Sequence, residues 1–520
     1  MQQFIAKYQD QIQGVISGFD RLVLRGSLRR LTFQRGMEEY LWQNHVLFKD
    51  YQQHVKKISE KVKEAAVAAF RQKKLPVIYL RRNDADKEQI ARAIAAERGI
   101  RVGPVCALSC LEPSPTFEHC GTHMVARVRP CLVIYHYSID REWGWMNARL
   151  QTWFPFYIQV CLNGREWLAR QMDRKRFLYC RQDNCFPWIK DWHGAQELLQ
   201  EQLKMRWAER LQSVAQRLNP LQPEIFRNYP SDYYWTCFQS EWATDISFRP
   251  GELQRLEPLW LEHGMLRFSS PDVLRFLGQK VPLSGKIPAC FARQLTTDFK
   301  RRQEGPRIKH RIDGNSVKAY GKAHTPMGDV FRVELTVNQV EQFRVYRPKE
   351  GGPEQDLDWR PMRRGIADLH RRTEVSEKAN QRYLDALSQV DDSTRLDELI
   401  RPLGQPQHWN GKRVRALHPF EAGDNRLLEA VNRGEFTVNG LRNRDLQRLL
   451  YDAPTSSPTQ ARRRSAAVSR KLRLLRAHKL IYKIPGTHRY HVTKSGRLTI
   501  IAVLTAQRAS LAQLNINVAA

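Results

Sequence analysis

Basic side chains alternate along a predicted strand in the middle of the chain, with a spacing that suits phosphate binding. Arg307, Lys309 and Arg311 occupy alternate positions, so a strand places all three on one face of a sheet. The next predicted strand adds Lys318 and Tyr320. A cationic sheet face beside an aromatic ring is typical of proteins that bind a phosphate backbone or a single strand. The alternative is a basic sheet in which the tyrosine only packs.

This segment resembles the active-site strands of plasmid and phage rolling-circle replication initiators. The resemblance rests on residues 316–322 (SVKAYGK) and 332–334 (RVE). In that family a tyrosine attacks a DNA phosphate while a divalent metal polarises the phosphoryl oxygen. The resemblance implies that Tyr320 is the nucleophile, that Glu334 is a metal or supporting carboxylate, and that Mg²⁺ or Mn²⁺ is the cofactor. The family's pair of histidines has no counterpart, because Tyr135-His136-Tyr137 holds one histidine.

Carboxylates elsewhere in the chain supply a second hypothesis for metal-dependent chemistry. Asp20 lies near the start of an apolar predicted strand, as the first carboxylate does in ribonuclease H-like nucleases. Nothing in the sequence brings partners to it, and surface or salt-bridged acids are the simpler interpretation. The candidate partners are Asp140, Glu142, Asp183, Glu241 and Asp245.

Four residues have the side-chain types of a structural zinc site, but their spacing is unusual. They are Cys106, Cys110, Cys120 and His123. The first two lie in an apolar stretch where cysteine packs as a small hydrophobic residue, so packing is the favoured interpretation. The aromatic run from Trp143 to Phe156 is interpreted as core rather than as a base-stacking surface.

The strongest concentration of charge is C-terminal. Residues 405–520 contain 21 Lys+Arg and 6 Asp+Glu, a local excess of 15. Three helices are predicted there, over 424–433, 442–451 and 462–478. In the third, Val468, Leu472 and Leu475 form one apolar stripe, which leaves the basic residues on the other faces. The basic face is expected to bind nucleic acid through Arg463, Arg464, Ser465, Arg470, Lys471, Arg473 and Arg476.

A predicted β-hairpin follows this helix, with strands at 480–484 and 489–493, and a last helix begins near Ser495. The order resembles the winged-helix modules of MarR-like bacterial regulators, chiefly in the stretch LRLLRAHKLIYKIPGTHRYHVTKSG. The resemblance implies that the third helix enters the major groove and that the wing, with His488 and Arg489, touches DNA nearby. The alternative is a winged helix used for protein contacts.

The remaining elements predict an N-terminal α/β domain (1–217), a central basic α+β domain (218–404) and the winged-helix domain (405–520). A strand from Phe19 is expected to break at Gly26, and a hairpin or strand is expected to turn at Asn163-Gly164 before a helix. Residues 347–358 are expected to form a surface loop, and 366–390 one long helix.

Composition narrows the class of protein. The 520 residues carry 85 Lys+Arg against 54 Asp+Glu, and the 10% of aromatic residues excludes a disordered or fibrous chain. The sequence contains no apolar run of membrane-spanning length and no evident leader peptide, so we expect a cytosolic protein without a membrane partner. The number of cysteines, nine, is odd, so we expect reduced thiols rather than a framework of disulfides. The oligomeric state is left open. No phosphate loop, serine-hydrolase elbow or metalloprotease motif occurs.

The whole chain also resembles a large bacterial family whose activity is uncharacterised, notably in LQTWFPFYIQVCLNGREWLARQ and RIKHRIDGNSVKAYGK. We expect a DNA-binding protein that uses the winged helix. The alternatives are a metal-dependent nicking or mobile-element enzyme that uses Tyr320, and a binder of structured RNA.

Overall fold

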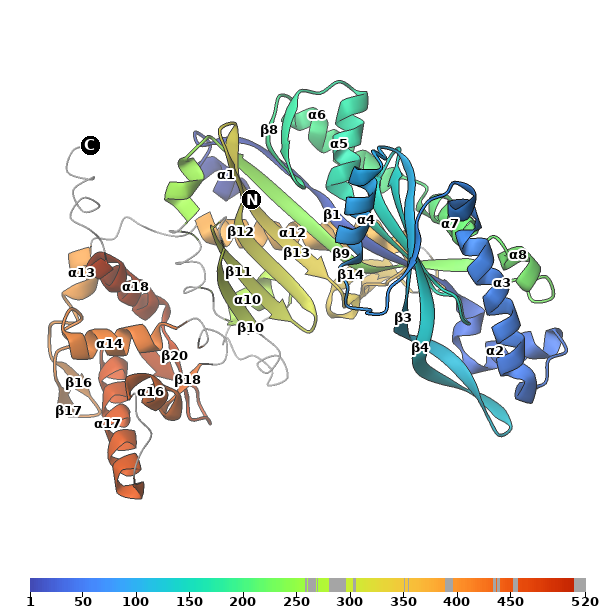
Figure 1. Cartoon of the computed structure of the whole chain (residues 1–520). Helices are drawn as coiled ribbons and strands as arrows, with labels where there is room; N and C mark the ends of the chain where they lie inside the picture. The colour runs from blue at the N-terminus through green and yellow to red at the C-terminus, as the bar shows by residue number, and fades with distance from the viewer. Residues whose placement is uncertain are drawn as a thin grey trace. The chain divides into compact units, whose positions relative to one another are not determined.

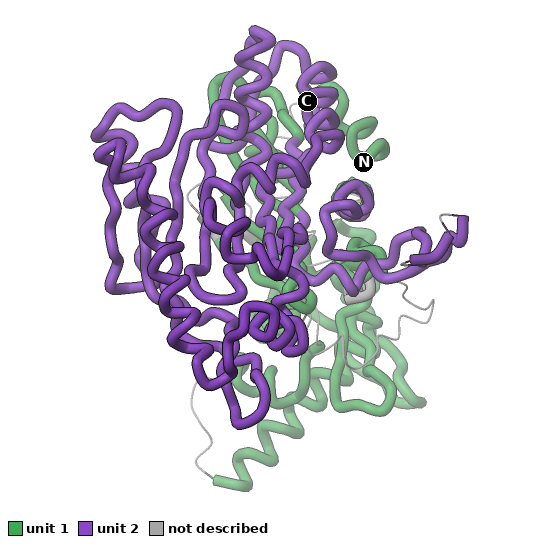
Figure 2. The backbone as a smooth tube through the Cα atoms, turned by 90° about the vertical axis from the view of Figure 1, so that its right-hand side faces the viewer, with its two compact units in different colours: residues 1–13, 246–334, 378–520 green, residues 14–245, 335–377 purple. Residues whose placement is uncertain are grey.

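The computed structural model describes most of the residues of the chain. The described residues are 1–257, 260, 268, 270–279, 296–302, 305–349, 351–353, 355–388, 396–433, 436, 440–451 and 457–508. They form two compact units built from non-contiguous segments (Figure 2). Unit 1 comprises 1–13, 246–334 and 378–520, and unit 2 comprises 14–245 and 335–377.

Unit 2 is built on a mixed sheet whose strands follow the order β9-β1-β6-β5-β4-β3-β2. Its neighbouring strands pair antiparallel from β1 through to β3, and β2 pairs parallel with β3. In order of the sheet, the bounds are Tyr233–Phe248 (β9), Ile12–Leu28 (β1), Ile158–Asn163 (β6), Gly144–Gln151 (β5), His123–Asp140 (β4), Gly103–Cys120 (β3) and Val77–Tyr79 (β2).

Helices of unit 2 pack their apolar stripes against this sheet; most of them share one large aromatic core, whereas the helix over Lys87–Glu97 packs in a separate cluster with β3 and β4. They are α2 (Gln34–Gln43), α3 (Tyr51–Gln72), α4 (Lys87–Glu97), α5 (Gly164–Arg174), α6 (Trp192–Glu201), α7 (Trp207–Leu218) and α8 (Gln222–Ile225). Two hairpins complete the unit, β7 (Tyr179–Gln182) with β8 (Cys185–Ile189) and β14 (Arg344–Pro348) with β15 (Leu357–Pro361). The prediction of a surface loop over 347–358 is therefore wrong at both ends, because residues 347–348 and 357–358 pair with each other in β14 and β15.

Strand β1 is longer than the sequence predicted, and Asp20 lies in its middle rather than near its start. The strand also continues through Gly26 without a break. A side chain at Gly26 would come within 2.9 Å of the Trp235 ring, so the glycine allows close packing rather than ending the strand.

Asn163-Gly164 is the start of α5 and not a hairpin turn. The Asn163 Oδ1 atom accepts hydrogen bonds from the backbone amides of Arg165 and Glu166, both at 2.9 Å, which is N-terminal capping. Gly164 is required because a Cβ there would lie 2.0 Å from the Phe19 carbonyl oxygen. The hairpin alternative is therefore wrong, whereas the alternative of a strand that runs directly into a helix is confirmed, since β6 ends at Asn163 and α5 begins at Gly164.

In unit 1, the strands follow the order β10-β11-β12-β13, with bounds Thr296–Arg302, Gly305–Ile312, Asn315–Thr325 and Gly328–Val337. Asp313 and Gly314, with φ of 43° and 82°, make the tight turn between β11 and β12. Helices α1 (Gln2–Lys7) and α10 (Ser270–Phe276) belong to the same unit. The long helix predicted near 366–390 is α12, Leu369–Ser388; Val390 lies outside the described residues.

The C-terminal part, residues 396–508, has its own apolar core. Its helices are α13 (Leu396–Ile400), α14 (Ala422–Val431), α16 (Asn443–Leu450), α17 (Pro458–Ala477) and α18 (Lys494–Arg508). The sheet β18-β20-β19 joins Leu441–Arg442, Arg489–Val492 and Ile481–Lys483, and a separate hairpin pairs β16 (Gln407–Trp409) with β17 (Lys412–Val414). The helices, wing strands and last helix predicted from the sequence are all present, whereas β18 was missed.

The helix and strand content confirms the prediction of a multidomain α/β and α+β protein. Among the described residues, no helix combines the length and the hydropathy that crossing a membrane requires.

Candidate nucleic-acid interface and carboxylate site

Helix α17 separates an apolar face from a cationic face. Ser457 caps the helix through Oγ, which accepts from the Gln460 amide at 3.2 Å, and Pro458 occupies its first turn. Val468, Leu472 and Leu475 are buried with at most 2% of their surface exposed, which confirms the predicted stripe. The exposed arginines on the other side lie at positions 462, 463, 470 and 473, and the helix holds no acid. Their successive spacings of one, seven and three residues place them along one face.

The other basic residues predicted on this helix are partly engaged by the protein. The Arg464 guanidinium lies 4.9 Å from the Tyr451 ring centroid, and the Arg476 guanidinium lies 4.7 Å from that of Trp409. Lys471 is half-buried, and the Ser465 carbonyl accepts from Asn443 Nδ2 at 2.9 Å. Of the predicted residues on this helix, Arg463, Arg470 and Arg473 are therefore the ones open to a ligand, and the exposed Arg462 lies on the same face.

The hairpin of β19 and β20, which was predicted as a wing, contacts α17 and carries the exposed His488 and Lys483 and the half-buried Arg489. Further along, Tyr482 and His491 stack with ring centroids 5.9 Å apart. Burial, with help from Arg497 and Arg489, lowers the pKa of His491 to about 4, so this ring is neutral at pH 7. This hairpin therefore offers a polar and aromatic surface that also carries the positive charges of Lys483 and Arg489.

The central strand pair presents the cationic face that the alternation predicted. Arg307 lies opposite Tyr320, and Lys309 lies opposite Lys318. Burial, followed by the repulsion of Lys318, Arg311 and Arg307, lowers the pKa of Lys309. Arg307 Nε is buried and has no hydrogen-bond partner among the described residues. Arg311 is paired with Asp298 at 2.9 Å and Lys318 with Glu334, so Arg307 and Lys309 are the residues of this face that an anion could contact.

Lys318, Tyr320 and Glu334 form a bonded group rather than a set of open side chains. Lys318 Nζ lies 2.5 Å from Glu334 Oε1, and the Tyr320 hydroxyl donates to Glu334 Oε2 at 3.1 Å. Burial alone would raise the pKa of Glu334, but Lys318 and Arg332 outweigh it and hold the pKa below its ordinary value. The carboxylate is thus charged at pH 7, its charge is balanced by Lys318, and Tyr320 is oriented by it.

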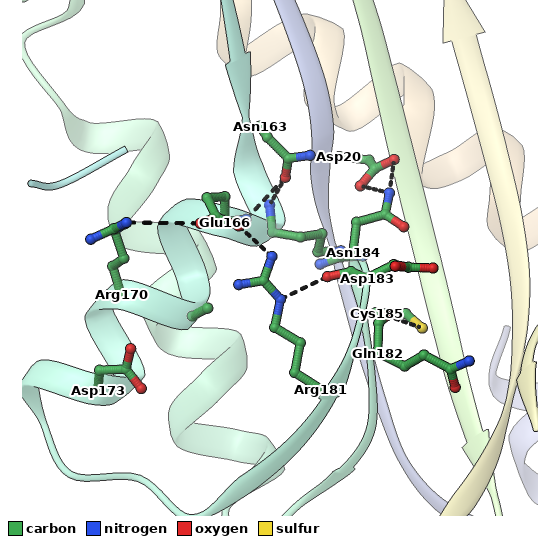
Figure 3. Close-up of polar contacts among 12 residues, drawn as sticks. Asp20, Asn163, Glu166, Arg170, Asp173, Arg181, Gln182, Asp183, Asn184 and Cys185 are labelled. Atoms are coloured by element: carbon green, nitrogen blue, oxygen red, sulfur yellow. Dashed lines mark hydrogen bonds and ion pairs between the residues drawn. The ribbon is translucent and has the colours of Figure 1, made fainter. Parts of the chain in front are cut away.

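Two of the carboxylates singled out in the sequence come together within unit 2. Asp20 on β1 and Glu241 on β9, which neighbour each other in the sheet, place ligand oxygens within 4.8 Å of one another. Asp20 is 5% exposed, and both of its carboxylate oxygens accept from Asn184 Nδ2 at 2.8 Å (Figure 3). Two oxygen ligands this close can approach one divalent cation.

These carboxylates open into a cavity of about 610 Å³ whose wall is strongly charged and polar. Figure 3 shows the wall beyond Asp20, where the capped end of α5 points Glu166 toward Arg181, with which it forms an ion pair. The lining comprises Asp20, Arg21, Glu88, Arg92, Trp145, Met146, Asn147, Cys161, Leu162, Asn163, Glu166, Arg181, Asp183, Asn184 and Glu241. This volume accommodates a small polar ligand or a nucleotide unit.

Arg21 lines the same cavity as the two carboxylates, as do Arg92 and Arg181. Arg21 donates from Nε to Cys161 Sγ at 3.3 Å, and its pKa is raised by Cys161 first and then by Glu241 and Glu88. Burial raises the pKa of the Cys161 thiol. The thiol is therefore protonated at pH 7, and Arg21 remains a positive group on the cavity wall.

The other predicted acids have structural partners or lie apart. Asp245 forms a fully buried ion pair with Arg165 at 3.1 Å, and Glu142 pairs with Arg210. Asp140 Oδ1 accepts from the backbone amides of residues 142 and 143. Asp183 lines the cavity. Of the five acids proposed as partners of Asp20, Glu241 is therefore the one that the fold places beside it.

The zinc hypothesis is wrong. Cys106 and Cys110 are buried in β3, whereas Cys120 and His123 pair at the far end of the β3–β4 hairpin, about 30 Å along the strand from Cys110. The aromatic run packs as predicted, since Trp143, Phe154 and Phe156 are buried, although Trp145 reaches the cavity and lies 4.5 Å from the Arg92 guanidinium.

Comparison with known proteins adds no relative. No family model, no curated protein and no solved structure matches this chain. The function is therefore argued from the chain's own residues.

Proposed function

We propose that the protein binds nucleic acid, with duplex DNA as the preferred partner, through the C-terminal part. The observation that carries this proposal is the exposed face of α17, where Arg462, Arg463, Arg470 and Arg473 stand without an acid on the helix. Arginines in such an array contact phosphates and can reach guanine edges in the major groove.

The order of the surrounding elements supports this assignment. Helix α14, strand β18, helices α16 and α17 and the strands β19 and β20 follow one another, and β20 lies between β18 and β19 in the sheet. This is the element order of a winged helix, in which α17 is the recognition helix. Arg307 and Lys309 provide a second cationic surface that also suits a single strand.

Fluorescence anisotropy with equal-length labelled probes tests the proposal. The full-length protein is titrated with duplex DNA, single-stranded DNA and a structured RNA hairpin at matched salt. We expect the tightest binding to the duplex and a steep loss of affinity with salt. Tighter binding to the RNA hairpin would favour the structured-RNA alternative, and no salt-dependent binding to any probe would refute the proposal.

A second candidate function, metal-dependent phosphodiester cleavage, is favoured by the proximity of Asp20 and Glu241. A divalent cation such as Mg²⁺ or Mn²⁺ held by these carboxylates would polarise a phosphoryl oxygen. Arg21 would then stabilise added negative charge on the cavity wall.

Supercoiled plasmid incubated with and without Mg²⁺ or Mn²⁺ tests this candidate. Metal-dependent cleavage that Asp20→Asn abolishes and Tyr320→Phe leaves intact supports the carboxylate mechanism. If Tyr320→Phe abolishes the cleavage and Asp20→Asn retains it, the tyrosine mechanism is supported instead. If the wild-type protein cleaves the plasmid with neither metal, both the carboxylate mechanism and the tyrosine mechanism are contradicted.

A further inference from the structure

The hairpin of β16 and β17 is a tight basic loop that lies outside the winged-helix element order. Trp409 pairs with Lys412 across a two-residue turn. Asn410 and Gly411 form this turn with φ of 48° and 71°, the left-handed values that a type I′ turn requires and that Asn-Gly adopts readily. The conformation of the tip is therefore determined by its own sequence.

The hairpin is fixed to the last turn of α17 by two contacts. The Arg476 guanidinium lies over the Trp409 ring at 4.7 Å, and His478 Nε2 lies 3.0 Å from the Arg415 carbonyl oxygen. Arg415 also forms two hydrogen bonds to Asp424 of α14, at 2.7 and 2.6 Å. The hairpin and α17 therefore hold a defined geometry within the C-terminal part, where Figure 1 draws β16 and β17 beside α14 and α17.

The tip presents cations whose charge no neighbouring acid balances. Lys412 and Arg413 are exposed, and Arg413 pairs across the strands with the exposed His408. Residues 403–420 contain no Asp or Glu. Neither Lys412 nor Arg413 forms an ion pair with any residue that the structure describes.

We propose that this hairpin tip is a second phosphate-contacting element, which binds the backbone of duplex DNA next to the segment that α17 occupies. The inference rests on the proposed function of α17 and extends it. The exposed arginines of α17 run from Arg462 to Arg473, which are 11 residues apart, or about 16 Å at 1.5 Å per residue. The hairpin extends this array from the C-terminal end of the helix, where Arg476 contacts Trp409.

The test compares three full-length variants by anisotropy with one labelled 20-base-pair duplex between 50 and 200 mM KCl. The hairpin variant is Lys412→Ala with Arg413→Ala, and the helix variant is Arg463→Ala with Arg470→Ala and Arg473→Ala. Two lost phosphate contacts should lower the salt slope by about 1.8, since each contributes about 0.9. The loss of affinity over this fourfold salt range would then be about 12-fold smaller than for the wild type.

The control variant removes two exposed cations from unit 2, Lys56→Ala with Arg101→Ala, and should keep the wild-type slope. A lowered slope in both the hairpin and the helix variants supports the proposal. A lowered slope in the helix variant alone overturns the hairpin's role and leaves the proposed function intact, whereas unchanged slopes in both overturn the two together. If the alanine variant loses its melting transition, the variant Lys412→Gln with Arg413→Gln repeats the test, because glutamine keeps a long side chain without the charge.

Discussion

Neutralising the exposed face of α17 should weaken the dependence of DNA affinity on salt by a calculable amount. The three arginines to be replaced by alanine are Arg463, Arg470 and Arg473, which are exposed and belong to no ion pair among the described residues. If each contacts one phosphate, the slope of log affinity against log salt falls by about 2.7. Between 50 and 200 mM KCl, the wild type should therefore lose about 40-fold more affinity than the triple variant loses.

The measurement is anisotropy of one labelled duplex at five salt concentrations. The matched control removes three exposed arginines of unit 2, through Arg101→Ala, Arg127→Ala and Arg227→Ala, so that the net charge of the protein is the same. Equal slopes for the triple variant and the wild type would refute the assignment of α17. Equal reductions in the triple variant and the control would show that net charge alone, and no particular face, determines binding.

Three further predictions concern the folded state. Arg165→Met should lower the free energy of unfolding by about 3 to 5 kcal/mol, because it leaves the Asp245 carboxylate buried without its cation. A melting temperature within about 2 °C of the wild-type value would contradict this. Asn163→Ala should cost about 1 kcal/mol by removing the cap of α5, and Asn163→Asp, which can still accept the same hydrogen bonds, should restore most of it in denaturant titrations. Burial raises the pKa of Glu257 to about 7 from its ordinary value of 4.5. Between these pH values the folded state therefore binds a proton that the unfolded state releases. The free energy of unfolding should fall by up to about 3 kcal/mol as the pH rises from about 4.5 to 7. Melting curves of Glu257→Gln should lack this component of the pH dependence, and identical profiles in the two proteins would refute it.

Local patterns predicted the C-terminal part well because its determinants lie within a few residues. The stripe of Val468, Leu472 and Leu475 recurs at helical spacing, and it is buried as the period requires. Strand β18 escaped prediction because two residues, Leu441 and Arg442, show no period at all. They form a strand through pairing with β20, which lies nearly 50 residues later.

The carboxylate pair could not be derived from the sequence because it depends on contacts between distant segments. Asp20 and Glu241 are 221 residues apart, and only the neighbouring positions of β1 and β9 in the sheet bring them together. The sequence marked both residues as candidates but gave no reason to choose Glu241 over Asp245. Burial decides between them, because Asp245 is committed to Arg165.

Asn163-Gly164 shows a different limit of local reasoning. The same dipeptide favours a type I′ turn and a helix start, since asparagine both tolerates left-handed backbone and caps helices. In this chain the residues that follow decide the outcome, because Trp167, Leu168 and Met172 place an apolar stripe on a helix that packs in the core of unit 2. At Asn410-Gly411 the flanking residues pair, and the turn forms instead.

A photo-crosslink from the exposed face of α17 would show whether this helix docks on duplex DNA. Ala466 is exposed between the two groups of arginines, so a benzoylphenylalanine placed there adds a reporter without removing a charge. With saturating duplex DNA, we expect a covalent protein–DNA adduct after irradiation, and none from the same reporter at the exposed Lys57 of α3. Binding of the duplex with no adduct from position 466, or with equal adducts from both positions, would contradict the claim that α17 docks on DNA.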